Sequence, residues 1–91
     1  VLKVLCGRTE EKVAAAAAKF GFEGYETDWR KVIARDDVDL IDIVTPGDTH
    51  VEIAIEAAKA GKMVFCEKPL ASTVAKAQAM YDAVAAAKVP N

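Results

Sequence analysis

Residues 38–50, VDLIDIVTPGDTH, decide the fold of this chain. The run over residues 38–44 is almost continuously apolar and rich in β-branched side chains, which predicts a buried strand. A turn with Pro and Gly follows, and residues 49–60 then carry apolar side chains at helical spacing, with Thr49 in the position of a capping box. A buried strand that enters a helix through a short turn is the repeating unit of a parallel α/β sheet.

The same alternation of strand and helix extends in both directions along the chain. Three further short runs predict strands, at residues 1–6, 24–26 and 62–66. Three further stretches with helical character predict helices, at residues 9–20, 27–34 and 72–88. This order predicts an α/β fold with a parallel sheet, and the continuous apolar runs indicate strands that are covered on both faces.

Individual residues in these segments carry further expectations. Thr9 is placed to cap the helix at residues 9–20, and Gly21 to end it. The side chains that form one stripe on the last helix are Val74, Ala77, Tyr81 and Val84. Asp42 interrupts the strongest strand, and because a buried unpaired carboxylate is costly, we expect it to accept hydrogen bonds from a neighbouring loop.

The composition is that of a small globular domain and excludes several classes of function. The 91 residues are enough for one domain, 53% of them are apolar, 29% are charged, and the net charge is −2. The Lys and Arg residues are scattered, so we expect no nucleic-acid partner. No apolar run approaches the roughly 18 residues of a membrane span, so we expect no membrane partner.

The two cysteines, Cys6 and Cys66, each end a predicted strand. They are far apart in the sequence and no secretion signal is present, so a disulfide framework is not expected. We interpret both as small buried apolar residues of a protein in the reducing cytoplasm. The single histidine and the cysteine spacing match no zinc pattern, so no metal site is expected.

Polar residues follow three of the predicted strands at the point where each strand ends. These turns are Gly7-Arg8-Thr9, the segment from Thr45 to His50, and Glu67-Lys68-Pro69. Ligands of parallel sheets bind beyond the carboxyl ends of the strands, so we expect the three turns to converge on one edge. A lysine held rigidly at that edge, beside a glutamate and a proline, can stabilise a negative or developing negative charge.

Each residue of these turns also has an ordinary alternative role. Lys68 and His50 are typical surface residues, and Arg8 can simply pair with Glu10 or Glu11. The proline and glycine of the middle turn are ordinary turn residues. Only the joint placement of the three turns at one edge favours a ligand site over these alternatives.

The pattern Thr45-Pro46-x-x-x-His50, followed by Glu67-Lys68-Pro69-Leu70, resembles the nucleotide-binding half of one oxidoreductase family. This is the glucose–fructose oxidoreductase, inositol dehydrogenase and rhizopine-catabolism (Gfo/Idh/MocA) family. The resemblance covers essentially the whole chain, from the family's second strand to a point just before its sixth. It implies a Rossmann-like domain that binds NAD or NADP, in an enzyme that transfers hydride at a carbon of a sugar, inositol or related polyol.

The resemblance also implies roles for the residues of the turns. The residues that line the cofactor cleft or lie beside it are Thr45, Pro46, Gly47 and His50. Glu67 and Lys68 approach the nicotinamide ribose and the substrate, and Lys68 assists catalysis. The peptide bond before Pro69 is cis in many members. The family usually has asparagine after Thr-Pro, so Gly47 lacks one hydrogen-bonding side chain.

The turn after the first strand bears on the choice of nucleotide. Many NAD-preferring members carry an acid there, which holds the adenosine ribose, and here that position is Gly7, followed by Arg8. An arginine can bind a 2′-phosphate in bidentate fashion, whereas an acid would repel it. We therefore expect Gly7 and Arg8 to lie at the adenosine end of the cofactor and to favour NADP over NAD.

Compared with the family, the chain lacks the opening strand with its Gly-rich loop, which binds pyrophosphate, and the C-terminal substrate domain. Residues 1–91 are therefore interpreted as a partial dinucleotide-binding domain that is inactive alone. In the family fold the missing strand lies between the strands predicted at residues 1–6 and 38–44, which leaves both with unpaired edges. We expect a longer parent protein or a homo-oligomer in which another copy fills this gap.

Two other functions fit the same fold. One is a non-catalytic module that senses a nucleotide or another small ligand on a Rossmann scaffold, and the other is a purely structural or interaction fragment. The oxidoreductase is the main interpretation, because a Glu-Lys-Pro at this place in the strand order is more specific than the Thr-Pro turn alone.

Overall fold

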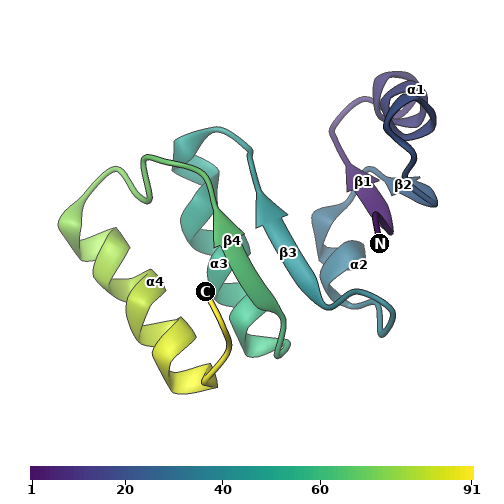
Figure 1. Ribbon diagram of the computed structural model, residues 1–91. Helices are drawn as coiled ribbons and strands as arrows, with labels where there is room; N and C mark the ends of the chain where they lie inside the picture. Colours follow the sequence, from purple (N-terminus) through teal and green to yellow (C-terminus); the bar gives the residue numbers. More distant parts are fainter. The chain divides into compact units, whose positions relative to one another are not determined.

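The computed structural model describes all residues from Val1 to Asn91, in two compact units, Val1–Val38 and Asp39–Asn91. Each unit contains one parallel two-stranded sheet and two α-helices (Figure 1). Strands and helices alternate along the whole chain, so the predicted α/β fold with parallel strands is confirmed. No helix combines the length and apolar character needed to cross a membrane.

The first unit is built on strands β1 (Val4–Cys6) and β2 (Gly24–Glu26), which pair in parallel with Val4 opposite Gly24. Helix α1 (Glu10–Phe20) connects them, and α2 (Trp29–Ile33) follows β2. Both helices pack against this sheet. The apolar side chains buried in this unit are Val13, Ala17, Val32, Ile33 and Val38.

The ends of the helices in the first unit show where local sequence signals act. Gly21 ends α1 in the left-handed conformation, with φ of 80°, as expected. Thr9 precedes α1 in an extended conformation, but its side chain makes no capping hydrogen bond, so the expectation of a side-chain cap is wrong there. At α2 the carboxylate of Asp28 accepts a hydrogen bond from the backbone N–H of Arg30 and provides the cap.

The second unit is built on strands β3 (Leu40–Ile43) and β4 (Met63–Cys66), which pair in parallel with Leu40 opposite Met63. A 3-10 turn, η1 (Gly47–Thr49), leads into the crossover helix α3 (His50–Lys59), and α4 (Val74–Ala87) follows β4. Helix α3 packs against both strands and α4 packs against α3. The helices therefore cover one face of this sheet (Figure 1).

Burial along the second sheet alternates from residue to residue. Ile41, Ile43 and Val64 are buried beneath the helices, whereas Phe65 is 62% exposed. The expectation that the strands are covered on both faces is wrong within this unit, because successive side chains point to opposite faces and helices cover only one. Asp42 lies on the uncovered face and is exposed, so it needs no hydrogen bonds from a buried loop.

The buried stripe of α4 differs from the predicted one. Met80 and Val84 are buried, but Val74 is 86% exposed and Tyr81 is 68% exposed. The helix is rotated so that Met80, rather than Tyr81, faces α3. The residues that α3 buries are His50, Ile53, Ala54, Ala57 and Ala58. Its alanines leave room for α4 to pack closely.

The strand pairing leaves one side of β1 and of β3 without a strand neighbour. β1 pairs with β2 and β3 pairs with β4, and no ladder joins the two sheets. On the far side of β4, the N–H of Val64 donates to the carbonyl of Pro90 at 3.1 Å.

Two threonines at helix starts provide a matched test of capping. The hydroxyl of Thr73 accepts a hydrogen bond from the N–H of Lys76 at 3.2 Å, whereas Thr9 accepts none. We expect Thr73→Ala to lower the free energy of unfolding by about 1 kcal/mol, measured by urea denaturation, because an orphan N–H of α4 loses its partner. Thr9→Ala should cost clearly less, and equal losses would contradict this account.

Candidate active site

Two of the three predicted turns lie at the carboxyl ends of β3 and β4 and are held together. The ring of His50 lies between them, with Nε2 at 2.8 Å from the carbonyl oxygen of Thr45 and Nδ1 at 3.0 Å from that of Pro69. A methyl group placed on Gly47 would lie 3.7 Å from the Cγ of Pro69, so the backbones of the two turns are close neighbours. The structure thus brings together the Thr45–His50 and Glu67–Pro69 segments.

The turn after β3 is closed by the side chain of Thr49. Its hydroxyl donates to the carbonyl of Pro46 at 2.6 Å and contacts the hydroxyl of Thr45. The predicted capping box is wrong, because Thr49 already has helical backbone angles, φ −96° and ψ −10°, and its side chain makes no cap bond. The Thr45 and Thr49 hydroxyls and the Pro46 carbonyl form one connected set of hydrogen bonds.

The turn after β4 starts from a backbone anchor on β3. The N–H of Glu67 donates to the carbonyl of Ile43 at 2.9 Å, which continues the β3–β4 ladder. The Glu67 carboxylate then accepts from the N–H of Lys68 at 3.0 Å, and the Lys68–Pro69 peptide bond is cis, as the resemblance implied. The Lys68 side chain is exposed and its ammonium has no hydrogen-bond or ion-pair partner.

His50 lies beside the turn after β3 and is not the surface residue that its ordinary alternative role describes. It is 1% exposed, which makes it the buried polar residue of the core rather than a surface residue. Both ring nitrogens already face backbone carbonyls, so neither is available to a ligand. No local sequence pattern indicates this arrangement, because Pro69 lies 19 residues further along the chain.

The third turn, Gly7-Arg8-Thr9, belongs to the first unit. A Cβ on Gly7 would lie 3.3 Å from the Cβ of Val13, so this position favours glycine because β1 ends close against α1. Arg8 is exposed and pairs with neither Glu10 nor Glu11, so that alternative is not realised. A guanidinium without a partner just beyond a strand end is suited to bind a phosphate.

The thiols of Cys6 and Cys66 are half-buried and free, one in each unit. Burial, reinforced by the carboxylates of Glu26 and Asp28, raises the pKa of the Cys6 thiol above its ordinary value. Burial, reinforced by Glu67 and Asp42, likewise raises the pKa of the Cys66 thiol. Both therefore stay protonated and poorly nucleophilic at neutral pH, so neither is a candidate nucleophile.

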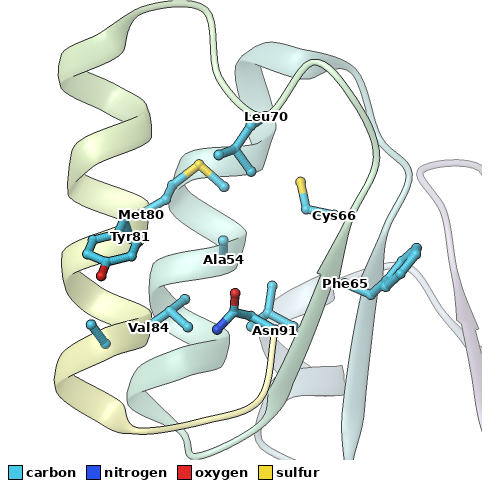
Figure 2. A pocket seen from close by; sticks show the side chains of 10 residues that line it. Ala54, Phe65, Cys66, Leu70, Met80, Tyr81, Val84 and Asn91 are labelled. Atoms are coloured by element: carbon cyan, nitrogen blue, oxygen red, sulfur yellow. The ribbon is translucent and has the colours of Figure 1, made fainter.

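A cavity of about 440 Å³ lies next to the turn after β4, between β4, α3 and α4 (Figure 2). Its lining is mostly apolar and includes Leu70, Met80 and Val84, and Cys66 borders it. No charged side chain lines it. A ligand rich in hydroxyl groups would leave them unsatisfied there, so the polar turns are the better candidate site.

A parallel α/β fold with polar turns beyond its strand ends defines a nucleotide-binding domain of the Rossmann class. Residues 1–90 match the model of the oxidoreductase family with an NAD-binding Rossmann fold, GFO_IDH_MocA. The chain belongs to this Gfo/Idh/MocA family, as its Thr-Pro and Glu-Lys-Pro turns indicated.

Two enzymes with known activities are similar to this chain. Levoglucosan dehydrogenase of Pseudarthrobacter phenanthrenivorans is 51% identical over 84 residues, which are 92% of this chain and 22% of that protein. Inositol 2-dehydrogenase of Salmonella typhimurium is 34% identical over 84 residues, or 91% of this chain and 24% of that enzyme. The chain thus spans less than a quarter of the length of these relatives.

Solved structures share the same fold. An oxidoreductase domain protein from Kribbella flavida is 62% identical, with a TM-score of 0.91 over 94% of this chain and 23% of that one. Levoglucosan dehydrogenase in complex with NADH and levoglucosan is 48% identical, with a TM-score of 0.94 over 98% of this chain and 24% of that one.

The carboxylate of Glu67 lies close enough to Cys66 to provide a test of the local electrostatics. Replacing it in Glu67→Gln keeps an acceptor for the Lys68 N–H but removes one cause of the raised thiol pKa. We expect Cys66 to be alkylated by iodoacetamide about twofold faster at pH 7.5, because its thiolate fraction rises. Cys6 serves as the internal control, and an unchanged or slower rate at Cys66 would contradict the assignment.

Proposed function

We propose that this chain forms part of the nicotinamide-binding site of an NAD(P)-dependent oxidoreductase that acts on a sugar, inositol or related polyol. The observation that carries the proposal is the joining of the two turns by His50, which holds the exposed Lys68 beside the Thr45–Pro46 turn. The names of the relatives, which are dehydrogenases of a sugar and of inositol, support the class of substrate.

The residues of the two turns would have different roles. The Thr45–Pro46–Gly47 turn would form one wall of the cofactor cleft, and Glu67 and Pro69 would set the position of Lys68. When bound, the nicotinamide would supply the hydride chemistry. The Lys68 ammonium would bind the substrate oxygen and hold or move a proton at Nζ. This role is feasible because no other group of the chain forms a hydrogen bond or ion pair with this ammonium.

The nucleotide is proposed to be NAD or NADP, with Arg8 favouring NADP. The partner-free guanidinium and the absence of an acid at Gly7 support NADP. The complex of levoglucosan dehydrogenase with NADH supports NAD. A homo-oligomeric assembly and a cytoplasmic location stay predictions.

The role of Lys68 can be tested in the whole protein that contains this chain. We expect Lys68→Met to lower kcat for oxidation of levoglucosan or myo-inositol by about 100-fold or more, because a positioned acid–base group is lost. The free energy of unfolding should stay unchanged, because the ammonium makes no contact in the folded chain.

Lys59→Met, at the opposite end of α3, is the matched control and should retain activity. Equal activity of the two variants would contradict a catalytic contribution of Lys68. A protein that binds NADH but oxidises no polyol would support the non-catalytic sensor instead.

The role of Arg8 predicts a change in nucleotide preference. We expect Arg8→Ala to raise KM for NADP by about tenfold, because a charge-assisted contact to the 2′-phosphate is lost, and to leave KM for NAD nearly unchanged. Lys12→Ala removes a nearby exposed positive charge and controls for long-range attraction of the nucleotide. Equal increases in KM for NADP and for NAD would refute a contact between Arg8 and the 2′-phosphate.

A further inference from the structure

The hydrogen bonds of His50 place a condition on its protonation state. Each ring nitrogen faces a backbone carbonyl, and a carbonyl oxygen can only accept. A neutral imidazole has one N–H and one lone pair, so one of the two contacts would set a lone pair against an oxygen. An imidazolium donates from both nitrogens and satisfies both contacts.

We propose that His50 is a positioning residue that donates, as an imidazolium, to the carbonyls of Thr45 and Pro69. These two hydrogen bonds are called the His50 bridge below. The bridge sets the distance between the turn after β3 and the turn after β4. Because Pro69 directly follows Lys68, the bridge also determines where the backbone of Lys68 lies relative to the Thr45–Pro46 turn.

Burial strengthens the requirement that both ring nitrogens of His50 donate a hydrogen bond. The ring is 1% exposed, so water cannot replace either donor, and no buried side-chain polar atom of the chain lacks a partner. The positive end of the α3 dipole opposes a cation at the first residue of the helix. Two carbonyl dipoles at hydrogen-bond distance act in the opposite direction.

Charged side chains also lie on the segments that surround His50. They comprise four acids and two lysines, all exposed: Asp42 on β3, Asp48 in η1, Glu52 on α3, Glu67 and Lys68 after β4, and Lys76 on α4. The two carbonyls of Thr45 and Pro69 are the direct hydrogen-bond partners of the ring.

The bridge is independent of the proposed function, although its use in cofactor binding rests on that function. The bridge therefore predicts that the spacing of the two turns depends on the His50 ring, whatever ligand they bind.

The protonation state can be read directly by NMR. In the whole protein labelled with ¹⁵N-histidine at pH 7, we expect one slowly exchanging imidazole in which both ring nitrogens show one-bond couplings to protons. This signal should be missing from His50→Gln. If no histidine of the wild-type protein retains two ring protons, the proposal is wrong, and this conclusion needs no variant.

Hydrogen exchange followed by mass spectrometry tests the effect on the turns. We expect His50→Phe to raise exchange in residues 67–71 by about five- to tenfold, because the turn after β4 loses its bond, and His50→Gln to raise it less. Thr49→Val is the matched control, because the Thr49 hydroxyl forms hydrogen bonds only within the turn after β3. An increase below twofold in His50→Phe, or an equal increase in Thr49→Val, would overturn the positioning role.

The test separates the bridge from the proposed function. Loss of turnover in His50→Gln with an intact imidazolium signal in the wild type supports both. An intact signal in a protein without any dehydrogenase activity supports the bridge and refutes the function. A neutral ring in an active dehydrogenase refutes the bridge alone.

Discussion

The candidate site depends on the parallel pairing of β3 with β4. In a parallel pair both strands end at the same edge, so the residues that follow them become neighbours although they are about twenty positions apart in sequence. The pairing continues one step past β4, because the N–H of Glu67 donates to the carbonyl of Ile43. The turn that carries Lys68 therefore starts from a backbone position that the sheet itself defines. Parallel pairing in turn requires a crossover, and α3 provides it.

The sequence predicts the elements of this chain better than it predicts the faces that they bury. Strand and helix positions follow from local apolar runs and turn residues, and the observed bounds lie within a few residues of them. The stripe of α4 could not be predicted, because the helix is rich in alanine and two adjacent stripes have similar apolar character. Contact with α3 selects the one that contains Met80, and this contact is not local in sequence.

Asp42 illustrates the same limit on a strand. Its neighbours are apolar on both sides, which indicates a fully buried strand when read along the chain. In the second unit the helices lie on the other face, so the carboxylate meets solvent and needs no partner. Which face of a strand is covered depends on where distant helices pack, and a run of apolar residues does not contain that information. That the turns after β3 and β4 lie together was predictable, but the partners of His50 and Thr49 were not.

The two threonines next to helices α3 and α4 show how backbone conformation decides the use of one side chain. Thr73 is extended, with φ −139° and ψ 159°, so its hydroxyl can reach forward to an N–H of the first turn. Thr49 already has helical angles because it is the last residue of η1, and its hydroxyl turns back to the carbonyl of Pro46. The 3-10 turn thus converts a capping residue into a residue that closes the loop after β3. This change leaves His50 as the first residue of α3, where its ring reaches both turns. A regular cap at Thr49 would have improved the start of the helix, and the structure instead uses that threonine to order the turn in front of it.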